Sequence, residues 1–81
     1  RRKRILYRAK HRGMTETDRL FGGFADLRLH AMTEEGLSGF ELLLDLSDNL
    51  LMDWIMADRP DDPDFAGNQI LQQIIRFKNT L

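Results

Sequence analysis

The chain has 81 residues, of which 42% are hydrophobic and 31% are charged, and its net charge is −1. A core of this size buries only roughly 60% of the surface of the unfolded chain, which predicts one domain over residues 1–81 and excludes a deep substrate cavity. Cysteine is absent, which excludes disulfides and thiolate metal sites. No apolar run approaches the about 20 residues of a membrane-spanning helix, so we expect no insertion into a membrane.

The charges are segregated along the chain. The basic residues at the start are Arg1, Arg2, Lys3, Arg4, Arg8, Lys10 and Arg12. The later acids are Glu41, Asp45, Asp48, Asp53, Asp58, Asp61, Asp62 and Asp64, with only Arg59 among them. Opposite fields at the two ends predict a dipolar surface that orients a partner. The alternative is a solvated surface whose charges only maintain solubility.

Apolar residues recur at helical spacing in nearly every segment, and no strand-like alternation occurs. The expected fold class is therefore all-α. The first helix is expected from about Arg2 to His11, with Ile5, Leu6 and Ala9 forming its apolar stripe. Gly13 is expected to end this helix, because glycine adopts the left-handed backbone conformation at little cost.

A second helix is expected to begin near Thr15, whose hydroxyl is suited to cap the free backbone N–H groups. Glu16 and Asp18 then favour the positive end of the helix dipole. The apolar face of this helix is predicted to contain Leu20, Phe21, Phe24, Leu27 and Ala31. Gly22 and Gly23 lie inside the helix, where they predict close packing against another backbone or a kink.

Three more helices are expected downstream. Thr33 starts the third, Ser47 or Asp48 caps the fourth, and a proline-containing acidic loop over residues 58–64 precedes the last. Their apolar positions are Leu37, Phe40, Leu43 and Leu44, then Leu50, Leu51, Trp54 and Ile55 with Met52 and Met56 beside them, then Ile70, Leu71, Ile74 and Ile75. Trp54 is assigned to the core, with an exposed binding role as the alternative. The result is a compact bundle of about five short helices, with fraying expected at Leu81.

Catalytic chemistry is not indicated by the residues present. The chain has no cysteine, no serine nucleophile motif and only two histidines, His11 and His30, which are not at metal-ligand spacing and are expected to be surface or capping residues. The pair Gly22-Gly23 lacks the lysine and the serine or threonine that follow a phosphate-binding loop. We therefore expect no enzyme activity, no bound metal and no cofactor of its own.

A nucleic-acid-binding module is one alternative, because the arginines of the first helix could neutralise phosphates and Tyr7 could stack on a base. The acidic second half and a pI near 6.1 argue against it, since nucleic-acid-binding domains are typically basic. No nucleic-acid partner is therefore expected.

A generic helical adaptor with an unknown partner is a further alternative.

The segment Arg12–Asp18 reads Arg-Gly-Met-Thr-Glu-Thr-Asp and places a cation, a glycine turn and two acids at one helix junction. One interpretation is structural, with Gly13 as a C-cap, Glu16 and Asp18 as helix-start acids, and Arg12 as their partner. The other interpretation is a surface that binds another protein. The physical chemistry of these residues allows both.

This segment resembles the Arg-Gly-x-x-Glu signature of the FAD assembly factors, or flavinylation factors, of succinate dehydrogenase. The downstream order is similar as well. It comprises Thr33-Glu34-Glu35, Phe40-Glu41-x-Leu43-Leu44, Asp48-x-Leu50 and Trp54-Ile55. The resemblance spans roughly Tyr7 to Phe77.

The resemblance implies a soluble five-helix protein, monomeric when free, that binds the flavoprotein subunit of succinate dehydrogenase and, in some bacteria, fumarate reductase. Such a protein promotes covalent attachment of FAD to a histidine of its client. Residue by residue, the resemblance assigns the client-binding patch to Arg12, Gly13, Met14, Glu16 and Asp18, with Arg8 and His11 as secondary candidates. With no transit-like segment seen, we expect the bacterial cytoplasm, or the mitochondrial matrix in a eukaryotic source.

Overall fold

The computed structural model describes residues 1–80, and within this range it contains five α-helices and no strand. The elements are α1 (Arg2–Lys10), α2 (Thr15–Arg28), α3 (Glu34–Leu44), α4 (Asp48–Met56) and α5 (Gln69–Asn79), with 3₁₀ turns η1 (Leu29–Ala31) and η2 (Pro63–Phe65). The predicted all-α class and the five helices are confirmed. The fraying expected at Leu81 lies outside the described residues.

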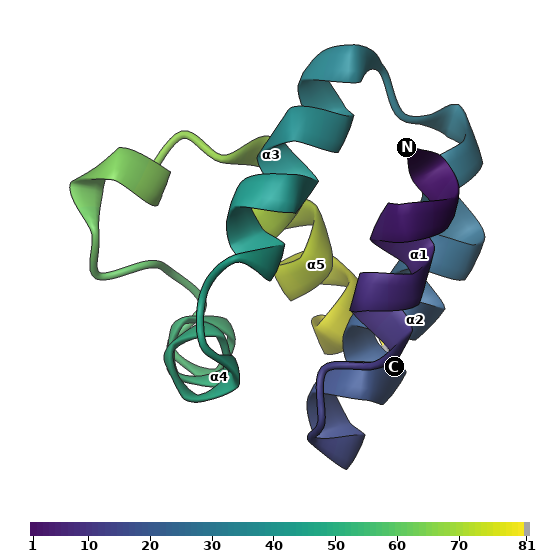
Figure 1. Ribbon diagram of the computed structural model, residues 1–81. Helices are drawn as coiled ribbons and strands as arrows, with labels where there is room; N and C mark the ends of the chain where they lie inside the picture. The colour runs from purple at the N-terminus through teal and green to yellow at the C-terminus, as the bar shows by residue number, and fades with distance from the viewer. Residues whose placement is uncertain (81) are drawn as a thin grey trace.

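The helices pack around one shared core. Figure 1 shows α1 and α2 side by side, α3 above α5, and α4 viewed down its axis at the edge of the bundle. α3 contacts both α1 and α5, and α5 also contacts α2 and α4. The buried apolar side chains are Ile5, Ala9, Leu20, Phe21, Phe24, Ala25, Leu29, Leu37, Phe40, Leu43, Leu44, Leu51, Trp54, Ile55, Ile70, Leu71, Ile74 and Ile75. Each helix thus buries the apolar stripe that its spacing predicts, with three exceptions.

Two exceptions lie at the end of α2, where Leu27 is 59% exposed and Ala31 is also exposed. The prediction that they belong to the buried face is wrong. The buried side of α2 follows Phe21, Ala25 and Leu29, and their spacing of four residues turns this side away from Leu27. The chain also changes from α-helix to the 3₁₀ turn η1 before Ala31, which removes that residue from the helical register.

The third exception is Leu50, which was expected on the buried stripe of α4 but is 36% exposed. It lies in the first turn of α4, at the edge of the face that Leu51, Trp54 and Ile55 bury. Met56, at the end of the same helix, is 69% exposed. The core assignment of Trp54 is confirmed, because only 2% of its surface is exposed.

The later helices begin at side-chain caps. The hydroxyls of Thr33 and Ser47 accept hydrogen bonds from the backbone N–H groups of Gly36 and Leu50, at 3.1 and 3.2 Å. Of the two residues considered for the start of α4, Ser47 is therefore the cap. Each of these side chains satisfies one N–H group that has no partner inside its helix.

Gly22 brings α1 and α2 close together. A Cβ atom at Gly22 would lie 3.0 Å from Cγ and 3.6 Å from Cα of Lys10, so a larger side chain would push α1 away. The expected close packing of this glycine against another backbone is confirmed. A Cβ at Gly23 would meet the ring of Phe77 at 3.6 Å, which is an ordinary contact.

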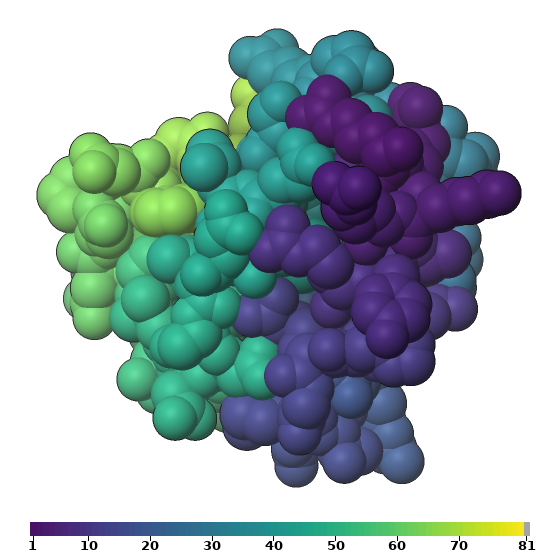
Figure 2. Space-filling model, viewed as in Figure 1, coloured from purple at the N-terminus to yellow at the C-terminus, as the bar shows by residue number. Residues whose placement is uncertain are grey.

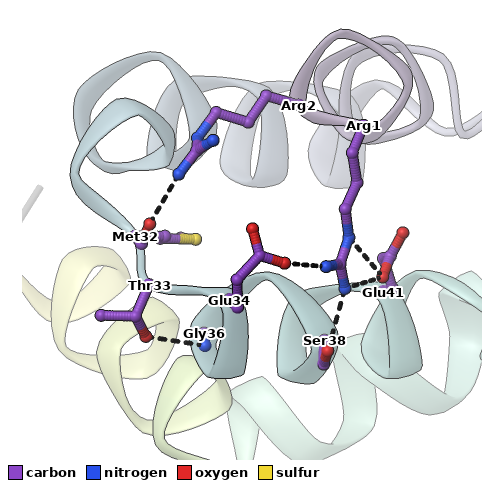
Figure 3. A network of polar contacts seen from close by, with 8 residues as sticks. All are labelled: Arg1, Arg2, Met32, Thr33, Glu34, Gly36, Ser38 and Glu41. Atoms are coloured by element: carbon purple, nitrogen blue, oxygen red, sulfur yellow. Dashed lines mark hydrogen bonds and ion pairs between the residues drawn. The ribbon is translucent and has the colours of Figure 1, made fainter.

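The basic first residues pair with acids of α3. Figure 3 shows the guanidinium of Arg1 between Glu34, Ser38 and Glu41, and its Nη2 lies 2.6 Å from Oε1 of Glu41. The hydrogen bond from Arg1 lowers the pKa of the Glu41 carboxyl. Further along α1, Arg8 Nη2 lies 2.5 Å from Oδ1 of Asp45.

These ion pairs change the expected distribution of charge. In the space-filling view, side chains of the first residues lie directly against those of α3 (Figure 2). Part of the opposite charge that looked segregated in the sequence is therefore paired within the chain. The dipolar surface is correspondingly weaker than the sequence suggests.

No helix within residues 1–80 has the length and apolar character that crossing a lipid bilayer requires.

Asp58 joins the ends of α4 and α5. It follows α4 with a φ of 62°, a backbone conformation that aspartate and asparagine tolerate better than most residues. Its Oδ1 accepts hydrogen bonds from Lys78 Nζ at 3.1 Å and from Asn79 Nδ2 at 3.2 Å. These hydrogen bonds and the charge of Lys78 lower the pKa of the Asp58 carboxyl.

A group whose pKa is lowered by folding stabilises the fold above its unfolded pKa, which is about 3.9 for aspartate. That stabilisation is lost as the pH falls through the folded pKa. We therefore expect Asp58→Asn to lower the melting temperature at neutral pH and to reduce the drop in melting temperature on acidification. Circular dichroism melts at about pH 7 and about pH 3 measure this difference. Asp61→Asn, at an exposed aspartate in the same loop, is the control, and equal behaviour of the two variants would contradict the assignment.

Candidate partner-binding turn

Residues Arg12–Asp18, which we call the motif turn, lead from α1 into α2. α1 ends at Lys10, and His11 is its C-cap, with its backbone N–H donating to the carbonyl of Tyr7 at 3.1 Å. Gly13 has a φ of 102°, a conformation that residues with a Cβ rarely adopt. The expected positive φ is confirmed, but the helix has already ended before Gly13. The glycine instead redirects the chain into α2.

Arg12 points into the molecule. Its side chain is only 8% exposed, and its Nε donates to Oδ1 of Asp48 at 2.5 Å. Nη1 donates to the carbonyl of Leu44 at 2.9 Å and Nη2 to the carbonyl of Leu46 at 2.5 Å. The guanidinium carbon also lies 5.5 Å from the centre of the Phe21 ring. Every guanidinium nitrogen therefore has an acceptor within the chain, and one face of the group rests against an aromatic ring.

These contacts place Arg12 where two helix ends meet. Leu44 is the last residue of α3, and carbonyls at a helix C-terminus lack partners within the helix and favour a cation. Asp48 is the first residue of α4, where the helix dipole favours an anion. Arg12 thus fixes the corner between α3 and α4 to the turn between α1 and α2. Its partners are a carboxylate and backbone carbonyls, but they belong to this chain.

The inner side of the motif turn is closed by its own residues. Asp18 Oδ1 accepts a hydrogen bond from the backbone N–H of Arg12 at 2.6 Å, so this acid braces the turn rather than capping α2. Thr17 is buried, and its hydroxyl donates to the carbonyl of Met14 at 3.1 Å. The prediction that Thr15 caps α2 is wrong. Met14, with an extended backbone, occupies the N-cap position, and Thr15 is already helical.

The outer side of the motif turn consists of Gly13, Met14 and Glu16. Gly13 and Glu16 are exposed, and Met14 is half-buried. A Cβ at Gly13 would have no neighbour within 4 Å, so the space outside this glycine is open. Within residues 1–80, the Glu16 carboxylate makes no hydrogen bond or ion pair. An uncommitted carboxylate beside an open glycine is suited to accept hydrogen bonds from another protein.

The two secondary candidates lie on α1 beside the turn. Arg8 is partly committed to Asp45. His11 is exposed, as expected for a surface histidine, and its ring lies 4.3 Å from the ring of Tyr7, which is 66% exposed. Arg8 lies in the last turn of α1, and His11 directly precedes the motif turn. His11 is the more exposed of the two.

Among residues 1–80, no group of three His, Asp or Glu side chains converges to hold a metal ion. A hollow of about 610 Å³ lies between α3 and the start of α5, and its lining includes Met32, Gly39, Asn68 and Gln73 rather than the motif turn. Gly13 and Glu16 of the motif turn are exposed, which suits contact with another protein.

The comparison with protein families tests the resemblance that the motif turn suggests. A family model described as flavinator of succinate dehydrogenase matches residues 3–78. The chain belongs to this family. The resemblance inferred from the motif turn is therefore confirmed, and it extends over nearly all of the residues of this flavinator family member.

Similar proteins carry related names. The chain is 43% identical over 63 residues to succinate dehydrogenase assembly factor 2, mitochondrial, of Dictyostelium discoideum, covering 75% of this chain and 45% of that protein. It is 43% identical over 60 residues to the FAD assembly factor SdhE of Acetobacter pasteurianus, covering 74% and 55%. It is 35% identical over 79 residues to succinate dehydrogenase assembly factor 2, mitochondrial, of Candida glabrata, covering 94% and 52%.

The chain thus spans about half the length of the curated relatives it matches. These relatives include a bacterial protein and mitochondrial proteins. No solved structure gave a significant match to the chain.

Asp48 is the partner of Arg12 that sequence reasoning missed. The sequence indicates it only as a helix-start acid, 36 positions away from Arg12. No spacing rule joins residues so far apart, since their meeting depends on how α3 and α4 pack against α1 and α2. The sequence did contain one signal, the surplus of later acids relative to the basic first helix. This surplus predicts that ion pairs form, but it does not predict which residues form them.

Proposed function

We propose that this chain is an assembly factor that binds the flavoprotein subunit of succinate dehydrogenase and promotes its covalent attachment to FAD. The observation that carries the proposal is the family match over residues 3–78, which includes the whole motif turn. The names of the relatives from Dictyostelium discoideum and Acetobacter pasteurianus support it. Fumarate reductase is a second client in this proposal.

The chain is not the catalyst in this proposal. Among residues 1–80, Thr17 is the one polar residue that is buried as a whole, and its hydroxyl is occupied by a backbone carbonyl. The nearly buried side chain of Arg12 is likewise occupied by Asp48 and two backbone carbonyls. The bond forms between FAD and a histidine that the client supplies, and the chain holds no cofactor of its own. Its contribution is differential affinity. By binding one arrangement of the flavin domain more tightly than others, the chain raises the population of that arrangement.

The motif turn supplies the client contact in this proposal. Gly13 allows close approach of the client backbone, Met14 offers an adaptable apolar contact, and Glu16 accepts hydrogen bonds from client donors. Arg12 and Asp18 act from inside, because their polar atoms hold the turn in shape. His11 and Arg8 extend the contact along α1.

Three further features belong to the same proposal. The free chain is a monomer and binds no nucleic acid. Its compartment is the bacterial cytoplasm, or the mitochondrial matrix in a eukaryotic source. Sedimentation of the purified chain tests the first feature.

The proposal is tested by measuring covalent flavin on a purified succinate dehydrogenase flavoprotein subunit. The client is incubated with FAD, with or without this chain, denatured and examined for flavin fluorescence in a gel. We expect the chain to raise the covalent yield, and a parallel incubation with a fumarate reductase flavoprotein tests the second client. An unchanged yield with a folded chain and a client from the same organism would contradict the proposal.

A further inference from the structure

A second surface lies at the other end of α1 from the motif turn. A hollow of about 220 Å³ opens between the start of α1 and the end of α2 with η1. Its apolar lining comes from Leu6, Ala25 and Leu29. α1 has nine residues, so this hollow and the motif turn are separated by about 13 Å along the helix.

The rim of the hollow is basic. Lys3 is exposed and pairs with no acid of residues 1–80, and His30 is also exposed. Arg2 also lines the hollow, and its Nη2 donates to the carbonyl of Met32 at 2.8 Å (Figure 3). The one acid of the rim, Asp26, is neutralised by Lys10, whose Nζ lies 3.0 Å away. The net charge that faces an approaching ligand is therefore positive.

Size and lining define the ligand. The hollow is smaller than the roughly 300–1,000 Å³ of small-molecule clefts, so it is suited to one inserted side chain rather than a whole cofactor. Its walls offer aliphatic groups and no phenylalanine, tyrosine or tryptophan on which nucleic-acid bases could stack. We propose that this hollow binds an acidic peptide segment of a partner protein, with one apolar side chain inserted between Arg2, Lys3 and His30.

The arrangement has two separable parts. The apolar floor removes the inserted side chain from water, which supplies the favourable free energy of burial. The basic rim attracts the flanking acids and sets their orientation, so it contributes more to selectivity and to the rate of association. A peptide must carry both features to bind well.

The test uses the whole chain and a short fluorescein-labelled peptide with one phenylalanine between acidic residues, followed by fluorescence anisotropy. We expect Lys3→Glu to weaken binding by about three- to tenfold, since it removes a favourable charge and adds a repulsive one, and His30→Glu to weaken binding as well, since it adds a repulsive charge. Both residues are exposed, so circular dichroism should show an unchanged fold. Arg76→Glu makes a similar change in net charge at an exposed position of α5 and should leave binding nearly unchanged.

Two further probes separate the alternatives. A peptide with glutamine in place of the phenylalanine should bind more weakly, and a labelled single-stranded DNA should also bind more weakly than the original peptide. The proposal is overturned by the absence of peptide binding, by equal effects of Lys3→Glu and Arg76→Glu, by indifference to the phenylalanine, or by tighter binding of the DNA.

Discussion

Replacing Arg12 by alanine should lower the free energy of unfolding by about 3–5 kcal/mol, which is the usual cost of removing one partner from a buried ion pair. The side chains of Arg12 and Asp48 are 8% and 14% exposed, so Asp48 would be left nearly buried without its cation. The carbonyls of Leu44 and Leu46 would lose their donors as well. Urea unfolding followed by circular dichroism measures the change, and the melting temperature should fall by more than about 12 °C.

Arg8→Ala is the matched control. Arg8 also pairs with an aspartate at 2.5 Å, but the two side chains are 35% and 67% exposed, so solvent screens the interaction. We expect a loss below about 1 kcal/mol for this variant. Equal losses for Arg8→Ala and Arg12→Ala would show that the Arg12 cluster is not buried in solution.

Replacing Trp54 by alanine should also destabilise the fold by about 3–5 kcal/mol, because it creates a cavity in the core. Trp54 is 2% exposed, and its ring lies 5.2 Å from the ring of Phe65. It is the one tryptophan of the chain, so circular dichroism rather than fluorescence must follow unfolding of this variant.

Trp54→Phe separates packing from hydrogen bonding. The indole Nε1 is buried and has no hydrogen-bond partner within residues 1–80, so phenylalanine removes an unsatisfied donor and keeps an aromatic ring. We expect it to cost less than half as much as alanine. If Trp54→Ala instead left stability unchanged and weakened client binding, Trp54 would be a binding residue rather than a core residue.

The helices could be predicted from the sequence because their signals are local. Apolar residues at spacings of three and four define the buried face of α5, and Ile70, Leu71, Ile74 and Ile75 are all buried as predicted. Thr33 is a cap that depends only on a nearby backbone N–H group. Local signals fail where one element changes into another. Leu27 has helical spacing but lies just beyond the buried face, and no residue marks the change to η1.

The orientation of the Arg12 side chain could not be predicted for a different reason. An arginine beside a glycine turn is compatible with an exposed contact and with a buried anchor. The choice depends on whether acceptors from other elements lie within reach. Asp48 and the carbonyls of Leu44 and Leu46 meet Arg12 only after α3 and α4 have packed against α1 and α2. The motif identified the family, and the structure shows the contacts that its cation makes within this chain.

The motif turn therefore combines an inner and an outer part. Arg12 and Asp18 hold the backbone in place, and in the proposed function Gly13, Met14 and Glu16 present a preorganised surface to the client. Preorganisation lowers the entropy cost of binding. Loss of Arg12 would reduce client flavinylation through unfolding, which makes Arg12 variants ambiguous reporters of client contact. Glu16 is the better probe, since within residues 1–80 its carboxylate has no partner to lose.

The most direct test compares client flavinylation by Glu16→Ala and by Glu35→Ala, each corrected for the folded fraction measured by circular dichroism. Glu35 is an exposed glutamate in the first turn of α3, so both variants remove the same charge from the start of a helix. We expect Glu16→Ala to slow covalent FAD attachment by at least about tenfold, because a charge-assisted hydrogen bond contributes about 1.5–3 kcal/mol. Glu35→Ala should match the unmodified chain. Equal rates for the two folded variants would contradict the claim that the outer side of the motif turn binds the client.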